Sequence, residues 1–190
     1  MEILLLGTGA ADGWPNAFCR CPSCAVQRSL GAQRRPTSAL VDGRLLLDCG
    51  PAAPVNAQRV GADLAAVEAV LVTHAHSDHL DPSFLLHRSW VSDQPLTVYE
   101  PAAVVAACRP WLAPDQTAVR LVEVTAGDAV EVCGYSVDVV PAAHEAFGEA
   151  VLYRVQDAGA SVLYATDTGP WAPGALAALG ESCSFKEKRS

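Results

Sequence analysis

The sequence is poor in basic residues, in aromatic residues and in long apolar runs. Lysine and arginine number 13 against 21 acidic residues, and the net charge is -8. Nucleic-acid-binding surfaces usually carry a basic stripe, but here only the local pair Arg34–Arg35 and a short basic tail at 186–189 are found. We therefore expect a small-molecule substrate and no nucleic-acid partner. No stretch approaches about 20 apolar residues, so no membrane span is expected.

The N-terminus shows no export signal. Met1 is followed by Glu2, and the apolar run from Ile3 to Leu6 is too short for the core of a signal peptide. These features predict a cytoplasmic protein. In that reducing compartment, the seven cysteines favour metal binding or simple burial over disulfide bonds, and the odd number agrees with this interpretation.

The length and the apolar content are those of one globular domain. The chain has 190 residues, of which 51% are hydrophobic, and this is enough for a sizeable core. We expect a single domain at 1–180, without internal repeats or a long linker. Residues 181–190 lack the alanine, valine and leucine of the rest. This segment is expected to be a loose, disordered tail or the end of a truncated chain.

Short apolar runs alternate with helix-like segments along the chain. Strands are predicted at 2–7, 37–50 (two strands joined by the turn Asp42-Gly43), 69–73, 96–100, 119–124, 129–134, 135–140, 151–156 and 161–167. Helices are predicted at 52–62, 80–90, 101–112 and 173–180, and Pro110 is expected to disturb the helix at 101–112. Strand pairs mixed with helices favour an α/β sandwich of packed layers.

Residues 73–79 read THAHSDH and place three of the five histidines within six positions. Imidazoles without partners are costly to bury, so such a cluster favours a metal cation as a shared partner. His74 and His76 lie two residues apart just after a predicted strand, and an extended backbone directs both to the same side. Asp78 and His79 add two more ligand-type side chains. This nitrogen and oxygen set suits Zn²⁺, Mn²⁺ or Fe²⁺.

Two further candidate ligands lie far downstream, each at the end of a strand-like segment. His144 follows VDVVPAA, and Asp167 follows VLYAT. Ligands gathered at the ends of successive strands would suit a site at one rim of a sheet. A lone histidine is usually ordinary, but the order and company of His144 favour a ligand role. His87 has no such company and is expected to be structural or exposed.

These motifs resemble those of the metallo-β-lactamase superfamily. THAHSDH resembles its H-x-H-x-D-H signature, and His144 and Asp167 match its later single histidine and aspartate. The segments GTGAADGWP, LLLDCGP and ATDTG also resemble recurring pieces of this family, so the resemblance covers about residues 1–171. It implies an αββα sandwich with a two-metal site between the sheets.

The resemblance also implies a role for each ligand. One metal ion is expected at His74, His76 and His144, a second at Asp78 and His79, and Asp167 is expected to bridge both. The ions would be Zn²⁺ or Mn²⁺. Asp48 is expected to lie beside the ligands and to help hold their geometry.

A second cluster, FCRCPSC at 18–24, contains Cys19, Cys21 and Cys24. Three thiolates in six residues suit a tetrahedral, structural Zn²⁺ whose fourth ligand is not evident, and the alternative is three unrelated thiols. Its place after the first G-T-G loop resembles a group within the superfamily. That group contains the phosphoribosyl cyclic-phosphate phosphodiesterase and the pyrroloquinoline-quinone biosynthesis protein B, and the intact histidine pattern favours the phosphodiesterase type.

The sequence departs from the family pattern after His144, because no further histidine follows to complete the second metal site. The chain also stops soon after ATDTG, where family members continue. We therefore expect a weak or substituted second metal ion and an αββα sandwich that is incomplete on its C-terminal side. An exposed sheet edge could be covered by another chain, for example in a homodimer.

The predicted activity is that of a metal-dependent hydrolase. A metal-bound hydroxide would attack a small phosphodiester or cyclic phosphate, and Asp78 would be the catalytic residue that orients this nucleophile or takes its proton. A thioesterase or lactonase using the same metal ions is the enzymatic alternative. A truncated metal-binding protein without turnover is the non-enzymatic alternative, and the missing last histidine supports it.

Overall fold

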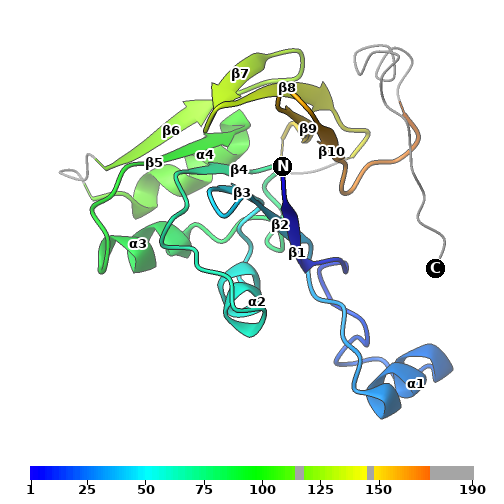
Figure 1. Cartoon of the computed structure of the whole chain (residues 1–190). Coiled ribbons are helices and arrows are strands. Elements are labelled where there is room, and N and C mark those ends of the chain that lie inside the picture. Colours follow the sequence, from blue (N-terminus) through cyan, green and yellow to red (C-terminus); the bar gives the residue numbers. More distant parts are fainter. Residues whose placement is uncertain (114–117, 145–147, 172–190) are drawn as a thin grey trace.

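A computed structural model of the chain describes residues 1–113, 118–144 and 148–171 (Figure 1). Ten strands are present in these ranges: β1 (Ile3–Gly7), β2 (Ser38–Val41), β3 (Leu45–Leu47), β4 (Ala69–Leu71), β5 (Leu96–Glu100), β6 (Val119–Glu123), β7 (Ala129–Val132), β8 (Tyr135–Pro141), β9 (Val151–Gln156) and β10 (Ser161–Tyr164). The helices are α1 (Pro22–Leu30), α2 (Ala53–Arg59), α3 (Ser83–Ser89) and α4 (Ala102–Cys108), and a 3₁₀ turn, η1 (Arg109–Trp111), follows α4.

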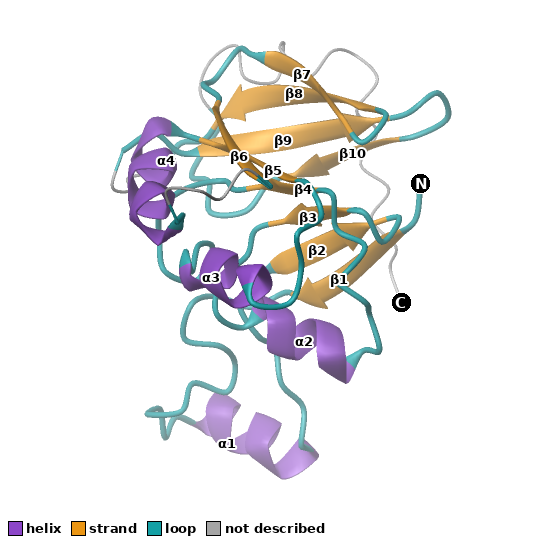
Figure 2. Cartoon of the chain, turned by 90° about the vertical axis from the view of Figure 1, so that its left-hand side faces the viewer, coloured by secondary structure: helices purple, strands orange, loops and turns teal. Residues whose placement is uncertain are grey.

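The first sheet has the strand order β1-β2-β3-β4-β5-β6. Strands β1, β2 and β3 are antiparallel neighbours, whereas β3 to β6 run parallel. Parallel neighbours need crossover connections, and α2, α3 and α4 provide them in turn. Such crossovers are nearly always right-handed, so consecutive ones running in the same direction across a sheet place their helices on one face. Figure 2 shows these three helices on the face that is turned away from the second sheet.

The second sheet is antiparallel throughout, with the order β10-β9-β8-β7. Two hydrogen bonds connect it to the first sheet next to the end of β4. The Tyr153 hydroxyl donates to the carbonyl oxygen of Val72 at 2.8 Å. The backbone N–H of Val151 donates to the carbonyl oxygen of Thr73 at 3.0 Å. The segment that precedes the histidines is therefore held by both sheets.

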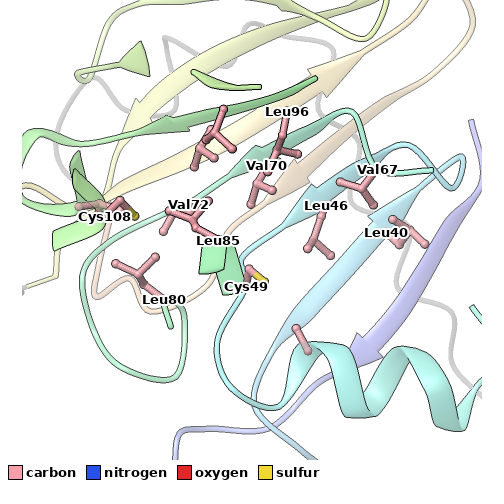
Figure 3. Packing of buried hydrophobic residues seen from close by; sticks show 14 of the residues in the cluster. Leu40, Leu46, Cys49, Val67, Val70, Val72, Leu80, Leu85, Leu96 and Cys108 are labelled. Atoms are coloured by element: carbon pink, nitrogen blue, oxygen red, sulfur yellow. The ribbon is translucent and has the colours of Figure 1, made fainter. Parts of the chain in front are cut away.

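Alternation along the short parallel strands divides the apolar residues between two cores. In β3, Leu45 and Leu47 enter the core between the sheets, while Leu46 enters the core under the helices (Figure 3). In β4, Leu71 and Val70 divide in the same way. Because successive side chains point to opposite faces, a strand covered on both faces is apolar throughout, as these are.

The structure confirms the predicted αββα-type architecture for one helical layer and the two packed sheets, which are the layers that the described residues form. Every predicted strand segment in the described ranges contains a strand, and Asp42-Gly43 forms the predicted turn, with φ of 45° and 70°. Within the predicted helix at 101–112, α4 ends at Cys108 and the chain passes into η1 around Pro110, which lacks an N–H, so the expected disturbance by this proline is confirmed. The helix predicted at 173–180 and the tail predicted at 181–190 lie outside the described residues.

Helix α1 was not expected from the sequence. It stands away from both sheets on a long excursion between β1 and β2 (Figures 1 and 2). The residues around it begin and end it in the usual way, with Cys21 as the N-cap, Pro22 in the first turn and Gly31 at the C-cap with φ of 64°. None of the helices in the described ranges has the length and apolarity needed to cross a bilayer.

Candidate metal centre

The candidate ligands meet at one edge of the two packed sheets. Asp48 follows β3 directly, and His74 lies three residues beyond β4. From the second sheet, His144 follows β8 and Asp167 follows β10. The expectation that strand ends gather these residues at one rim therefore holds. Together with His76, Asp78 and His79 they form what we name the inter-sheet site.

Three imidazoles from two sheets face one another. Nδ1 of His76 lies 3.0 Å from Nε2 of His74 and 3.1 Å from Nε2 of His144. The ring centroids of His74 and His144 are 4.8 Å apart, and each of the three rings is nearly perpendicular to the other two. The other nitrogen of His74, Nδ1, is 3.0 Å from the Thr73 hydroxyl, so Nε2 is the nitrogen that faces the other two imidazoles.

A second set of ligand atoms surrounds Nε2 of His79. This nitrogen lies 2.7 Å from the Asp167 carboxylate and 3.2 Å from that of Asp78. The opposite nitrogen, Nδ1, lies 2.6 Å from the Asp48 carboxylate, which is fully buried. A carboxylate behind a histidine fixes the tautomer and the orientation of the ring, so Asp48 has the geometry expected for it. Asp167 also lies 3.8 Å from His74 and so stands between the two sets.

The pKa values of the two buried histidines are shifted in opposite directions. Burial, with neighbouring His79, His76 and His144, lowers the pKa of His74 to about 3, so its imidazole is neutral, as a metal ligand must be. Burial also disfavours the charged form of His79. The hydrogen bond and charge of Asp48, together with the charges of Asp78 and Asp167, outweigh this effect and raise its pKa to about 9. This pocket of carboxylates therefore stabilises a positive charge.

The backbone around the site is held in unusual conformations. Asp48 and Asp167 both have positive φ, 58° and 50°, a region that few non-glycine residues adopt and that is enriched at functional sites. Thr73 stabilises Asp48 by donating its N–H at 2.8 Å and its hydroxyl at 3.0 Å to one carboxylate oxygen. A Cβ on Gly50 would lie 1.8 Å from the carbonyl oxygen of Asp78, so only glycine permits this close approach.

The loops that carry the two distant ligands are joined to each other. The N–H of Gly169 donates to the carbonyl oxygen of Ala143 at 2.8 Å, and the N–H of Ala143 donates to the Thr168 hydroxyl at 3.1 Å. These bonds place His144 and Asp167 side by side. Sequence inspection assigned no role to Thr73, Gly50 or Thr168. For Thr73, the sequence signal that could have indicated a role at the site is its position as the first residue of the THAHSDH motif.

The inter-sheet site fits divalent cations. Ligands 2.0–2.1 Å from a tetrahedral Zn²⁺ are separated by about 3.3 Å, close to the nitrogen spacing of the three imidazoles. The candidate ligands form two overlapping groups, and within each group the ligand atoms lie within 4.8 Å of one another. One group is His74, His76 and His144, and the other is His74, His79 and Asp167. Asp78 lies outside both groups but beside His79.

Cys19, Cys21 and Cys24, which we name the cysteine loop, form a separate cluster at the start of α1. Their sulfur atoms lie within 4.8 Å of one another, and in the described part of the chain no fourth ligand-type side chain joins them. The Cys24 backbone N–H, aided by the neighbouring cysteines, lowers the pKa of Cys21 to about 7. Burial raises the pKa of Cys24. Among the other cysteines of the described ranges, Cys49 and Cys108 are buried and Cys133 is partly buried.

Solved structures share this fold. The metallo-beta-lactamase fold protein YhfI from Bacillus subtilis superposes with a TM-score of 0.61 at 16% identity, covering 86% of this chain and 61% of that one. A diphosphatase from the PhnP family gives 0.62 at 24% identity, covering 80% and 61%. Human tRNase Z, short form, gives 0.59 at 18% identity, covering 86% and 67%.

Sequence comparison finds relatives named ribonuclease Z. The protein from Mycobacterium sp. strain KMS is 34% identical over 193 residues, and that from Mycobacterium tuberculosis strain H37Rv is 31% identical over 191 residues. Both alignments cover 90% of this chain and 63% of the relative, so the chain spans less than two thirds of the length of these proteins. The family model of the beta-lactamase superfamily domain matches residues 43–184, well over half of the chain. The chain therefore belongs to the β-lactamase superfamily.

Proposed function

We propose that the inter-sheet site holds two divalent metal ions, Zn²⁺ or Mn²⁺, and hydrolyses phosphodiester bonds in small substrates. The observation that carries the proposal is the contact between two ligand sets. One consists of the three facing imidazoles of His74, His76 and His144, and the other of His79 with Asp78 and Asp167. His74 and Asp167 connect them at 3.8 Å.

Bound metal ions would supply Lewis acidity, which lowers the pKa of water and stabilises negative charge at an attacked phosphorus. The chain supplies the rest. Asp48 orients His79 through Nδ1, and Thr73 fixes Asp48 in turn. The Asp78 side chain is 12% exposed and so can reach a water molecule, orient it for attack and accept its proton. Asp167, at 41% exposed, is open to solvent.

Two considerations favour a small phosphodiester. The names ribonuclease Z and diphosphatase both denote cleavage at phosphorus, which supports phosphodiesters over carboxylic esters for this chain. The net charge of -8 disfavours a long polyanion, which supports a small diester or cyclic phosphate over RNA. The names of the curated relatives make RNA the second candidate substrate.

The test is a substrate panel with protein loaded with Zn²⁺ or Mn²⁺. The panel contains bis(p-nitrophenyl) phosphate, a cyclic nucleotide phosphate, an RNA oligonucleotide, a chromogenic thioester and a lactone. We expect hydrolysis of the small phosphodiesters and its loss after chelation. His76→Ala should lower kcat/KM more than about 100-fold, beyond the range of residues that only orient a ligand. His87→Ala, an exposed histidine of α3, is the matched control and should be unchanged.

Other outcomes assign a different function. Preferential turnover of the thioester or lactone would make the protein an esterase with the same ligands. Preferential turnover of RNA would reverse the expectation of a small substrate. Bound metal with no hydrolysis of any panel member would identify a metal-binding protein without turnover, and activity that survives both chelation and His76→Ala would reject the metal centre as the active site.

The cysteine loop supports a further part of the proposal, a structural Zn²⁺ held by Cys19, Cys21 and Cys24. Three sulfur atoms within 4.8 Å of one another provide three of the four ligands of a tetrahedral site. Cys21 is also the N-cap of α1, where its sulfur accepts from the N–H of Cys24. Metal bound there would fix the first turn of α1 and the path of the segment between β1 and β2 that carries this helix.

A further inference from the structure

A cavity of about 270 Å³ lies on the helix-covered face of the first sheet, away from the inter-sheet site. Its lining includes Leu46, Val70 and Leu96 from β3, β4 and β5, and Phe84 from α3, and these side chains are apolar (Figure 3 shows the three sheet residues). An apolar space between helices and sheet is a usual form of ligand site, although this one is small.

Two polar side chains of α3, those of His87 and Arg88, interrupt the apolar lining. Arg88 of α3 is part of the cavity wall, and its Nη2 donates to the backbone carbonyl oxygen of Gln94 at 2.7 Å, which holds the guanidinium in place. Nη1 is shielded from solvent and has no hydrogen-bond partner among the described residues. Buried polar groups normally have partners, so a shielded guanidinium nitrogen beside a cavity is a candidate partner for an anionic group.

We propose that this cavity binds a small amphipathic carboxylate, with the hydrocarbon part against Val70 and Phe84 and the carboxylate paired with Arg88. The surrounding charge agrees with this occupant. Asp93 is the acidic residue that acts on Arg88, and burial still lowers the pKa of the guanidinium. Arginine remains charged in proteins, so the wall of the cavity keeps a net positive group that one carboxylate would neutralise.

The size of the cavity limits the ligand. At about 30 Å³ for each non-hydrogen atom, the volume taken by one molecule in liquid water, the cavity accommodates about nine such atoms. A six-carbon fatty acid or benzoate fits this limit, whereas a long-chain fatty acid does not. A neutral alcohol of the same length would fill the apolar part equally well, and only the acid can form charge-assisted hydrogen bonds with the guanidinium.

The experiment measures binding of hexanoate and 1-hexanol to the full chain by calorimetry or ligand-observed NMR. We expect hexanoate to bind about tenfold to 100-fold more tightly than the alcohol, which is the range for a hydrogen bond to a charged group. Arg88→Met keeps the apolar stem and should reduce the affinity for hexanoate to that for the alcohol. Arg59→Met, which removes an exposed arginine of α2 outside the lining, should leave both affinities unchanged.

A second variant tests the location without removing the charge. Leu64 lines the cavity and is partly exposed, so Leu64→Trp should fill the space with little effect on folding and should abolish binding of both ligands. Failure of the wild-type chain to bind hexanoate would overturn the proposal, as would equal affinity for acid and alcohol. Binding that persists in Leu64→Trp would place the ligand elsewhere and would overturn it too.

Discussion

The inter-sheet site and the cysteine loop are both candidate metal sites, but they are assembled in opposite ways. The inter-sheet site takes its ligands from strand ends in two sheets and is largely buried, with His74 and His79 at 1% and 2% exposure. The cysteine loop takes its three candidate ligands from six consecutive residues at the N-terminus of a helix that stands outside the core, and Cys21 is exposed. One site depends on the whole fold, and the other depends on one turn of helix.

This difference shows which contacts control each site. At the inter-sheet site, substitution of residues that touch no substrate should strongly reduce metal affinity, because a buried hydrogen-bond network couples the candidate ligands to the core. In contrast, changes in the core should have little influence on the cysteine loop. Variants that are expected to change metal binding at one site and not at the other test this contrast.

The largest effect is expected for Asp48→Ala. This change removes the buried partner of His79 and of Thr73, and truncating one member of a buried charged pair typically costs about 3–5 kcal/mol of stability. Affinity for metal at the inter-sheet site should fall about 10–100-fold. Denaturant unfolding and competition with a chromogenic chelator measure the two effects. Asp63→Ala, at an exposed position, is the control, and equal results for both variants would contradict the role of Asp48.

Glu100→Gln should change how the stability of the core depends on pH. Burial raises the pKa of Glu100 from 4.5 to about 7, so the folded chain retains a proton that the unfolded chain has lost between these values. The stabilisation is complete below pH 4.5 and disappears as the pH rises through 7, by about 3 kcal/mol in total. In Glu100→Gln, the unfolding free energy should lack this decline.

The control for this pH effect is Glu131→Gln, which changes an exposed carboxylate. Its unfolding free energy should follow that of the wild-type chain between pH 4.5 and about 8. Parallel curves for Glu100→Gln and the wild type would show that Glu100 is ionised equally in both states. The metal content of the cysteine loop should be the same in all three proteins at each pH.

Gly50→Ala tests the close approach behind the metal ligands. Its Cβ would lie 1.8 Å from the Asp78 carbonyl oxygen, so the backbone must shift and stability should fall by about 1–3 kcal/mol. The shift should also displace Asp78 and reduce turnover. Gly159→Ala, where the Cβ meets nothing closer than 3.8 Å, should be close to neutral in thermal unfolding and activity assays. Full activity in Gly50→Ala would show that the metal-binding loop tolerates the displacement.

The smallest effect on the body of the protein is expected for Cys21→Ser. Elemental analysis should show the loss of zinc from the cysteine loop, while the inter-sheet site keeps its metal. The free energy of unfolding of the two sheets should change less than in Asp48→Ala, because α1 stands away from both sheets. Cys133→Ser makes the same chemical change outside the loop and should keep all the metal. Loss of hydrolysis in Cys21→Ser would show that the two sites are coupled.

Sequence reasoning succeeded where one segment contains the whole signal. The spacing of His74, His76 and His79 after a buried strand correctly placed these side chains together just past the end of β4. The strands themselves followed from apolar runs, because a doubly covered strand has little freedom in composition. The position of Asp167 beside His79 needed the family resemblance, since their proximity arises from the packing of two sheets.

Two features escaped sequence reasoning for different reasons. Helix α1 carries ordinary signals, with Pro22 at its start and Gly31 at its end, but the cysteines directed attention to metal binding and no helix was predicted. The roles of Thr73 and Gly50 depend on contacts across the chain, with Asp48 and Asp78 respectively. Hydrophobic periodicity in the sequence does not predict such contacts, because they join single atoms at the ends of strands.

The hydrogen bond from Val151 to Thr73 has a consequence for the newly made chain. Asp167 is translated about 90 residues after His76, and at about 5–20 residues per second this takes about 5 to 18 seconds. During that interval the early histidines have neither their second-sheet neighbours nor the carbonyl-to-amide link that fixes the loop. If the inter-sheet site holds metal as proposed, binding at full affinity would therefore come late in biosynthesis, after both halves of the polypeptide have docked.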